Sequence, residues 1–202
     1  MVDFFVQGGG FMWPILIALL FGLAIVGERA YSLINSSLNT DQFFDDVKTI
    51  YDDSGKEQAI EFCENTQGPV ASIFYAGLSK MEKTKEEIEK AVQNAGGLEM
   101  AFLEKNMIWI NSVITIAPML GFTGTVVGMI KAFEDIKMAN DISPAVVAGG
   151  ISQALLTTAF GLIVAMIMQV AQNFFVSMID KLILDMEEQS IKIVEYLHNS
   201  IK

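Results

Sequence analysis

The sequence is poor in the side chains on which most enzymes and metal proteins depend. Its 202 residues include one cysteine, Cys63, and one histidine, His198. A single cysteine excludes an intrachain disulfide and a cysteine-based zinc site, and neither residue has a partner of its own kind for metal or nucleophilic chemistry. We therefore expect no resident metal or organic cofactor, and we do not expect an enzyme.

Basic residues are also few. There are 13 Lys and Arg against 24 Asp and Glu, which leaves a formal net charge of -11 at pH 7. Nucleic-acid binding requires a basic surface that neutralises phosphates. The charge balance therefore argues against a nucleic-acid partner.

Charge is absent altogether from three long stretches, residues 11–27, 106–130 and 142–179. A helix of about 20 apolar residues crosses the hydrocarbon core of a bilayer. The whole chain is 52% hydrophobic, and its mean hydropathy is +0.43. These observations predict an all-α integral membrane protein with three transmembrane helices, long cytoplasmic helical extensions and membrane lipid as its surroundings.

The charge pattern divides the chain into six segments. They are an N-terminus with the first transmembrane helix (1–28), a helical domain (29–105), the second transmembrane helix (106–130), a short loop (131–143), the third transmembrane helix (144–179) and a tail helix (180–202). We interpret the first apolar stretch as a retained helix, because its N-terminal flank is acidic and no small-residue cleavage site precedes Glu28 and Arg29.

Local motifs predict where several helices begin. Capping boxes, proline at the first helical turn, or both mark such starts. The candidates are Ser54–Glu57, Thr84–Glu87, Gly68–Pro69 and Ser143–Pro144. We expect the helix that starts after Thr84 to continue into the second span without a break.

The distribution of Lys and Arg predicts the orientation. Most basic residues lie between the first two spans or in the tail, whereas only Lys131 and Lys137 lie between the second and third spans. By the positive-inside rule, residues 29–105 and the tail are cytoplasmic, and the N-terminus and the 131–143 loop are periplasmic.

Small residues recur at helical spacing in the second and third spans. They indicate close approach of another helix. The packing candidates are Pro118, Gly121, Gly124, Gly128, Gly150, Ala154, Gly161 and Ala165. The pattern fits a tightly packed helix pair whose threonine bonds to its own helix, and it equally fits a helix lining a narrow, weakly polar passage.

Four polar residues are the candidates for lining such a passage. They are Thr115, Thr125, Gln153 and Thr158. None of the three spans contains a carboxylate, His, Lys or Arg, which membrane proton relays generally use. The chain is therefore either a non-conducting oligomeric scaffold or part of an assembly in which a partner supplies the carboxylate.

Two motifs carry a resemblance to a known family. Ala117–Ile130, APMLGFTGTVVGMI, and Gly150–Leu162, GISQALLTTAFGL, resemble the second and third transmembrane helices of the MotA/TolQ/ExbB proton-channel family. Asn173 and the Glu28–Arg29 pair that closes the first helix add to the likeness, which is greatest for the ExbB and TolQ branch.

The resemblance implies a function that neither composition nor spacing establishes. Family members form pentamers in the bacterial inner membrane, around a single-span ExbD- or TolR-like partner whose intramembrane Asp carries the proton. Protons are the coupling ion, and work passes to a TonB- or TolA-like periplasmic protein for outer-membrane import or envelope maintenance. By the motifs, Thr125 and Thr158 would face the partner's Asp.

The sequence departs from the family pattern at two places. Gln153 stands where the family often has Glu, and Ile167 stands where it often has Pro. The first change removes a second titratable group from the expected passage. The second predicts a straighter third helix.

Overall fold

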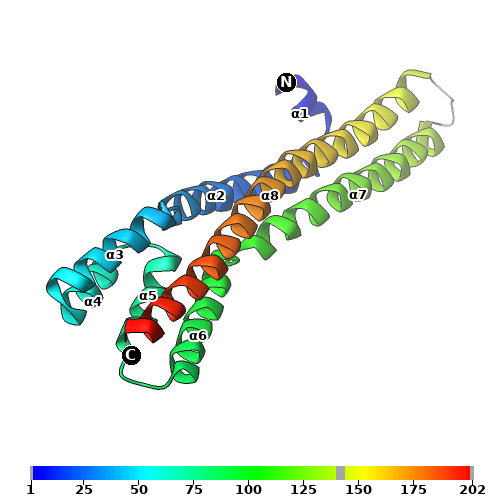
Figure 1. The fold of residues 1–202 in the computed structure, drawn as a ribbon. Coiled ribbons are helices and arrows are strands. Elements are labelled where there is room, and N and C mark those ends of the chain that lie inside the picture. The colour runs from blue at the N-terminus through cyan, green and yellow to red at the C-terminus, as the bar shows by residue number, and fades with distance from the viewer. Residues whose placement is uncertain (1, 140–143, 201–202) are drawn as a thin grey trace. The chain divides into compact units, whose positions relative to one another are not determined.

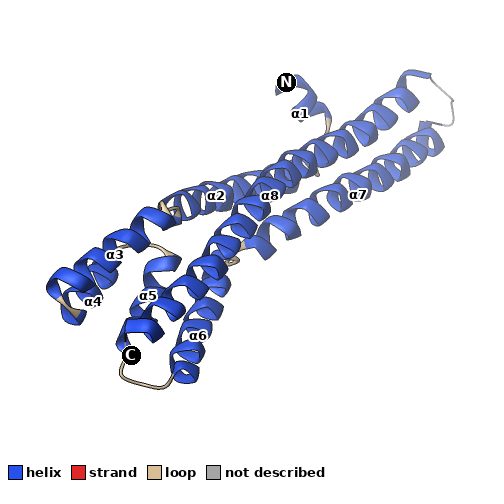
Figure 2. Cartoon of the chain, in the orientation of Figure 1, coloured by secondary structure: helices blue, strands red, loops and turns tan. Residues whose placement is uncertain are grey.

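The computed structural model describes residues 2–139 and 144–200, and helices make up most of this part of the chain (Figures 1 and 2). The helices are α1 (Val2–Gln7), α2 (Met12–Ser36), α3 (Thr40–Ser54), α4 (Lys56–Asn65), α5 (Pro69–Ser79), α6 (Lys85–Leu103), α7 (Met107–Ala139) and α8 (Pro144–Ser200). No strand occurs in the described residues. Three helical stretches, in α2, in α6–α7 and in α8, are long and apolar enough to cross a membrane. The all-α membrane fold is confirmed.

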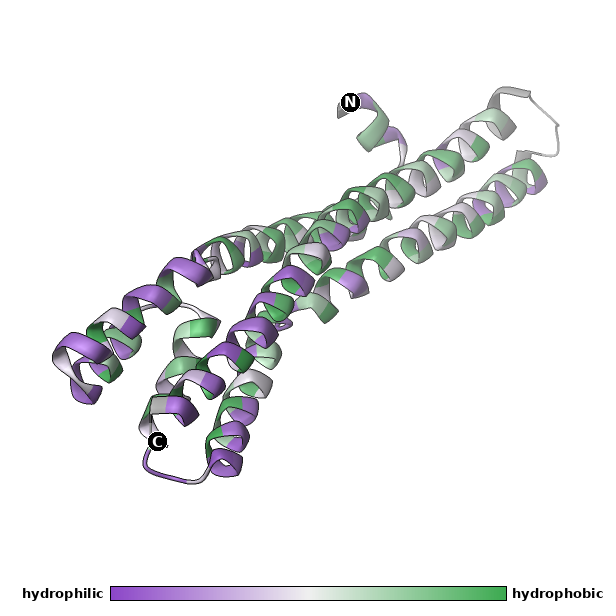
Figure 3. Cartoon of the chain, in the orientation of Figure 1, coloured by the Kyte–Doolittle hydropathy of each residue, from purple (hydrophilic) through white to green (hydrophobic). Residues whose placement is uncertain are grey.

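The chain forms two compact units. One comprises Met1–Glu28 and Asn106–Phe174, and we call it the span unit. The other comprises Arg29–Lys105 and Phe175–Lys202, and we call it the polar unit. Both α2 and α8 contribute to each unit. Figure 3 shows hydrophobic residues along much of α7 and the first part of α8, and many hydrophilic ones on α3, α4 and the last part of α8.

Close helix contacts hold the span unit together. Gly22 of α2 lies against Met168 of α8, so that a Cβ added at Gly22 would be 2.7 Å from the methionine sulfur. Phe21 and Trp109 meet edge to face with ring centroids 6.2 Å apart. At the start of α7, the side-chain amide of Asn106 donates to Glu28 at 3.2 Å.

Aromatic packing forms the core of the polar unit. Phe74 of α5 is fully buried, with the Phe43 ring centroid at 5.4 Å and the Phe44 centroid at 5.9 Å. Phe62 of α4 stacks on Phe43 at 5.5 Å. Phe43 of α3 thus joins the rings of α4 and α5 into a single cluster, which buries much apolar area in few residues.

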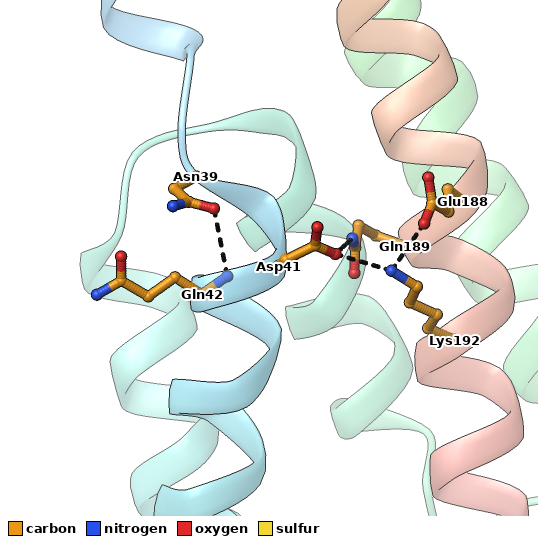
Figure 4. A network of polar contacts seen from close by, with 6 residues as sticks. All are labelled: Asn39, Asp41, Gln42, Glu188, Gln189 and Lys192. Carbon is orange, nitrogen blue, oxygen red and sulfur yellow. Dashed lines mark hydrogen bonds and ion pairs between the residues drawn. The ribbon is translucent and has the colours of Figure 1, made fainter.

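A polar network lies on the α3 and α8 side of the polar unit (Figure 4). Asp41 accepts hydrogen bonds from Gln189 at 2.9 Å and from Lys192 at 2.8 Å, and Lys192 also contacts Glu188 at 2.8 Å. The bond from Lys192 is the main cause of the lowered pKa of Asp41, and together the contacts raise the pKa of Lys192 to about 12. The network attaches the start of α3 to α8.

Two of the predicted helix starts occur in the structure. Thr84 and Glu87 form a reciprocal capping box at the start of α6. Pro69 is the first residue of α5. The capping box predicted at Ser54 is wrong, because α3 continues through Ser54, and Gly55, at φ 89°, separates α3 from α4. The predicted start at Ser143–Pro144 includes Ser143, which lies outside the described residues.

Three helix boundaries differ from those predicted. α2 continues past Arg29 to Ser36, since Arg29 is 1% exposed and its guanidinium donates to the carbonyl of Phe102 at 3.5 Å. The helix after Thr84 is interrupted before α7, where Asn106 has φ 65°, a conformation that asparagine tolerates better than most residues. Residues 131–139 of the expected loop are helical, because they contain neither glycine nor proline to stop α7.

Candidate functional site: a hydroxyl pair between α7 and α8

Glycine allows α7 and α8 to approach each other within the span unit. A Cβ added at Gly161 of α8 would lie 2.5 Å from the carbonyl oxygen of Ala117 and 3.2 Å from the Cα of Gly121. A Cβ at Gly121 of α7 would lie 2.8 Å from the carbonyl oxygen of Thr157. These are backbone contacts that a side chain would push apart, so the two helices can take this separation only with glycine here.

The same contact continues toward the end of α7. A Cβ at Gly124 would lie 2.6 Å from Thr157 Oγ1, one at Gly128 would lie 3.1 Å from the Cβ of Ala154, and one at Gly150 would lie 2.5 Å from the Cβ of Ala132. Of the other two packing candidates, Ala165 is 9% exposed, and Pro118 lies half-buried inside α7.

Thr125 of α7 and Thr158 of α8 meet in the middle of this contact. Their hydroxyl oxygens are hydrogen-bonded to each other, and both side chains are part-buried. Thr125 is also placed to donate to the carbonyl of Ala154 at 3.0 Å or to that of Gly121 at 3.3 Å. Thr158 is placed to donate to the carbonyl of Gly121 at 3.1 Å. The threonines thus bond across to the facing helix and not only back to their own.

The pair has two hydroxyl protons and more than two acceptors. If Thr158 donates to Thr125, then Thr125 donates to Ala154 or Gly121. If Thr125 donates to Thr158, then Thr158 donates to Gly121. In either arrangement one hydroxyl proton goes to the other threonine and the second goes to a backbone carbonyl. One of the two hydroxyl oxygens then accepts no bond from the other, so its lone pairs are available. The pair can therefore accept a hydrogen bond from a further donor and keep its existing hydrogen bonds.

A third threonine completes the contact. Thr157 is 1% exposed, and its hydroxyl is placed to donate to the carbonyl of Ala154 at 2.8 Å or of Gly121 at 3.2 Å. Adjacent residues of a helix point in directions about 100° apart. Thr157 therefore lies inside the helix pair, whereas Thr158 lies at its edge.

The other two polar candidates lie elsewhere on the spans. The exposed Thr115 donates to the carbonyl of Asn111 in its own helix at 3.1 Å. The side-chain amide of Gln153 lies beside Gly9, in the turn between α1 and α2, where an added Cβ would be 2.1 Å from its nitrogen. The structure thus brings Thr125 and Thr158 together. That Thr115 and Gln153 line a passage stays a prediction.

The hydroxyl pair can exchange hydrogen bonds, but it cannot itself carry charge. A threonine hydroxyl does not ionise near neutral pH, and the uncharged stretches around it hold no titratable group. A carboxyl brought to the exposed edge of the pair would find hydroxyl oxygens and little else that is polar. The arrangement suits a carboxylic acid from outside the chain.

The sequence motifs missed several residues of the contact. Ala117 and Ala132 face Gly161 and Gly150, and Thr157 bonds across the helices. Ala117 and Ala132 could have been found by their spacing, because both continue the i, i+4 and i, i+3 steps through Gly121, Gly124 and Gly128. The bonding partner of Thr157 has no signal in a single sequence.

The chain matches the model of one protein family. The family is described as the MotA/TolQ/ExbB proton channel family, and the match extends over residues 65–188. This range is more than half of the chain. It includes Thr125 and Thr158, all of α7 and most of α8.

Curated relatives carry related names. The chain is 29% identical over 173 residues to an ExbB-like biopolymer transport protein of Synechocystis sp.. The alignment covers 85% of this chain and 82% of that protein. It is 28% identical to an ExbB homologue of Methanothermobacter thermautotrophicus, over 89% of this chain and 64% of the relative. It is 28% identical to the Tol-Pal system protein TolQ of Pseudomonas aeruginosa, over 52% of this chain and 51% of the relative. The chain thus spans less than two thirds of the last two proteins.

Proposed function

The chain belongs to the MotA/TolQ/ExbB proton channel family, as a multi-pass membrane protein of the ExbB/TolQ type, and from this we infer that it is a subunit of a proton-driven motor. In this proposal the Thr125–Thr158 pair of each subunit serves the proton-carrying carboxyl of a single-span partner. The motor couples the proton motive force to work in the periplasm, such as outer-membrane import or envelope maintenance.

One observation carries the proposal, namely the bonded hydroxyl pair at the edge of a helix contact that is otherwise built from small residues. Packing alone would be satisfied by alanine or valine at these positions. Two hydroxyls from different helices that share a hydrogen bond form a polar point in a stretch without charge. Such a polar site favours binding of a polar side chain from another protein.

The number of hydrogen bonds indicates which protonation state of the partner's carboxyl is favoured. A protonated carboxyl can donate to the available lone pairs of the pair and leaves every internal bond in place. A carboxylate can only accept a hydrogen bond from Thr125 or Thr158, and the donating hydroxyl then gives up its bond to the other hydroxyl or to a carbonyl. Low dielectric also favours the neutral acid. The pair therefore favours the protonated form of the partner's carboxyl.

The partners follow from the type of family member. Membership in the ExbB/TolQ type suggests oligomers and ExbD- or TolR-like partners. We propose a homo-oligomeric ring, a pentamer as in the family, around single-span partners with an intramembrane Asp, connected to a TonB- or TolA-like protein. The proton is the only coupling species that this chemistry needs.

The proposed location is the inner membrane, with a periplasmic N-terminus and a cytoplasmic C-terminus. The ground is the basic-residue bias of the polar unit and the tail. A cysteine introduced at Lys83 should be protected from an impermeant maleimide in intact cells, while one at Lys137 reacts. Labelling of the cysteine at Lys83 but not of the one at Lys137 would contradict this orientation.

The second candidate is a scaffold that conducts nothing, which the close α7–α8 packing would also serve. Proton uptake into energised liposomes separates the two. We expect no flux with this chain alone, flux with the single-span partner, and none when the partner's Asp is changed to Asn. Equal flux with the Asn partner, or none in any case from rings shown to be intact, would contradict the motor.

A further inference from the structure

Five oxygen atoms from α7 and α8 gather at the hydroxyl pair. Two are the backbone carbonyl oxygens of Gly121 and Ala154, and the others are the hydroxyls of Thr125, Thr157 and Thr158. The distances from these hydroxyls to the carbonyls that they can donate to range from 2.8 to 3.3 Å. We call these five atoms the oxygen cluster. It belongs to two stretches of the span unit that contain no charged residue.

The hydroxyl protons of the oxygen cluster suffice to occupy both of its carbonyls. Each carbonyl oxygen has two lone pairs, and one of them takes the helix bond from the amide four residues further on. One proton lies between Thr125 and Thr158, and the other proton of the pair goes to one carbonyl. The proton of Thr157 then goes to the other carbonyl. The remaining lone pairs of both carbonyls are thus used within the cluster.

Thr157 has a different place in the cluster from the other two threonines. It is 1% exposed, and the acceptors that its hydroxyl has among the described residues are the carbonyls of Gly121 and Ala154. Its proton therefore occupies one of these carbonyls in every arrangement of the Thr125–Thr158 pair. This stays true when the pair gives a proton to a partner's carboxylate. Valine would fill the same space without occupying a carbonyl.

The state of the carbonyls affects which cation the site can bind. The membrane potential acts equally on every monovalent cation, so a preference for the proton must come from the site itself. Hard cations bind where several oxygen atoms converge, and backbone carbonyls serve as such ligands in the selectivity filters of channels. A proton needs only one oxygen with an available lone pair. A carboxylate beside open carbonyls would therefore suit Na⁺, whereas one beside occupied carbonyls suits the proton.

We propose that Thr157 is a specificity-determining residue, which favours the proton over Na⁺ because its hydroxyl occupies a backbone carbonyl that would otherwise bind the cation. The inference rests on the proposed function in one respect, because the carboxylate belongs to the single-span partner. It goes further by naming the competing ion and the residue that excludes it. Thr125 and Thr158 meet the carboxyl directly, and Thr157 acts through the carbonyls of Gly121 and Ala154.

Sodium sensitivity of proton uptake tests this role. Energised liposomes that contain the ring and its partner are compared in Na⁺ and in choline at equal ionic strength, and the parent should show equal flux in both. Thr157→Val should match the parent in choline, and Na⁺ should lower its flux about tenfold, because one more oxygen binds the cation next to the carboxylate. Thr157→Ala should show the same inhibition, since it opens the carbonyl and leaves no methyl group beside it.

Two control variants should remain insensitive to Na⁺. Thr157→Ser keeps the hydroxyl, so one carbonyl stays occupied. Thr115→Val removes a hydroxyl that bonds to the carbonyl of Asn111 in its own helix, away from the oxygen cluster. Inhibition by Na⁺ in either control would contradict a specific role for the Thr157 hydroxyl.

The outcomes separate this inference from the proposed function. Insensitivity to Na⁺ in both Thr157→Val and Thr157→Ala, or equal inhibition of the parent, would overturn the inference and leave the proposed function standing. Loss of flux in choline from intact rings of both variants would also overturn it, because Thr157 would then belong to the proton path. Absence of flux from the parent with its partner, in rings shown to be intact, would contradict the proposed function itself.

Discussion

The two units of the chain are held together by opposite means. In the span unit, α7 and α8 meet through glycine and alanine, with backbone atoms in near contact. In the polar unit, α3, α4 and α5 meet through a cluster of large rings that includes Phe43 and Phe74. The same chain thus uses its smallest side chains in one unit and some of its largest in the other.

The difference follows from the surroundings of each unit. In water, burying an aromatic ring removes much apolar area from solvent and drives packing. In lipid, apolar side chains gain little by leaving the solvent, so association depends on close van der Waals contact and hydrogen bonds between helices. The Thr125–Thr158 bond is the kind of contact that the lipid-embedded unit can use.

The largest effect on stability is expected from the polar unit. Phe74→Ala removes a fully buried ring and should lower the free energy of unfolding of this unit by about 3–5 kcal/mol. The buried thiol of Cys63, whose pKa burial raises to about 12, reports unfolding through its reaction with a maleimide. Labelling should rise in Phe74→Ala and stay low in Phe122→Ala, since Phe122 is 67% exposed. Equal labelling of both variants would contradict the role given to the aromatic cluster.

The next effect is expected from the span unit. Gly161→Leu places a side chain against the backbone of Ala117, and overpacking of this kind costs about 1–3 kcal/mol, with the upper end expected against a backbone that cannot rotate away. Gly149→Leu is the matched control, because a Cβ there meets nothing within 4 Å. Thermal unfolding in mild detergent should show a lower midpoint only for Gly161→Leu. Cys63 labelling at low temperature should stay low in both variants if the units unfold separately.

The smallest effect is expected from the exposed Asp41–Lys192 pair. The pKa of Asp41 lies below its usual 3.8, so the carboxylate stabilises the fold at higher pH, and this contribution disappears as the pH falls through the lowered value. The Lys192 contribution is present below pH 10.5 and disappears as the pH rises toward about 12. Asp41→Asn should lower the thermal midpoint slightly at pH 7 and by less at pH 3, which lies below the usual pKa of 3.8. Asp46→Asn changes the net charge equally and should show no such difference.

Local signals in the sequence predicted much of the fold. The uncharged stretches predicted the spans, and Thr84 and Pro69 predicted two helix starts, because such features depend only on near neighbours in the chain. The break at Asn106 and the burial of Arg29 depend on contacts from distant residues, Glu28 and Phe102 respectively. A single sequence contains no record of such contacts.

The sequence predicted the candidate site to a similar extent. The spacing of Gly121, Gly161 and their neighbours predicted faces that another helix could approach, but not which face would meet which. The two threonines were singled out by their position among small residues and by family resemblance. Their bond to each other, and the crossed bonds to Gly121 and Ala154, required the three-dimensional structure.

Adjacent threonines allow the most direct measurement. Thr157 lies inside the helix pair at 1% exposure, and Thr158 lies at its edge. Thr→Val keeps the shape and deletes the hydroxyl at either position, so both variants should form rings. We expect partner-dependent proton flux to be abolished by Thr158→Val and by Thr125→Val, partly retained by Ser at either position, and largely unchanged by Thr157→Val. Parental flux from Thr158→Val, Thr125→Val and their double variant, in rings shown to be intact, would contradict the proton-path role and leave these residues only a packing role.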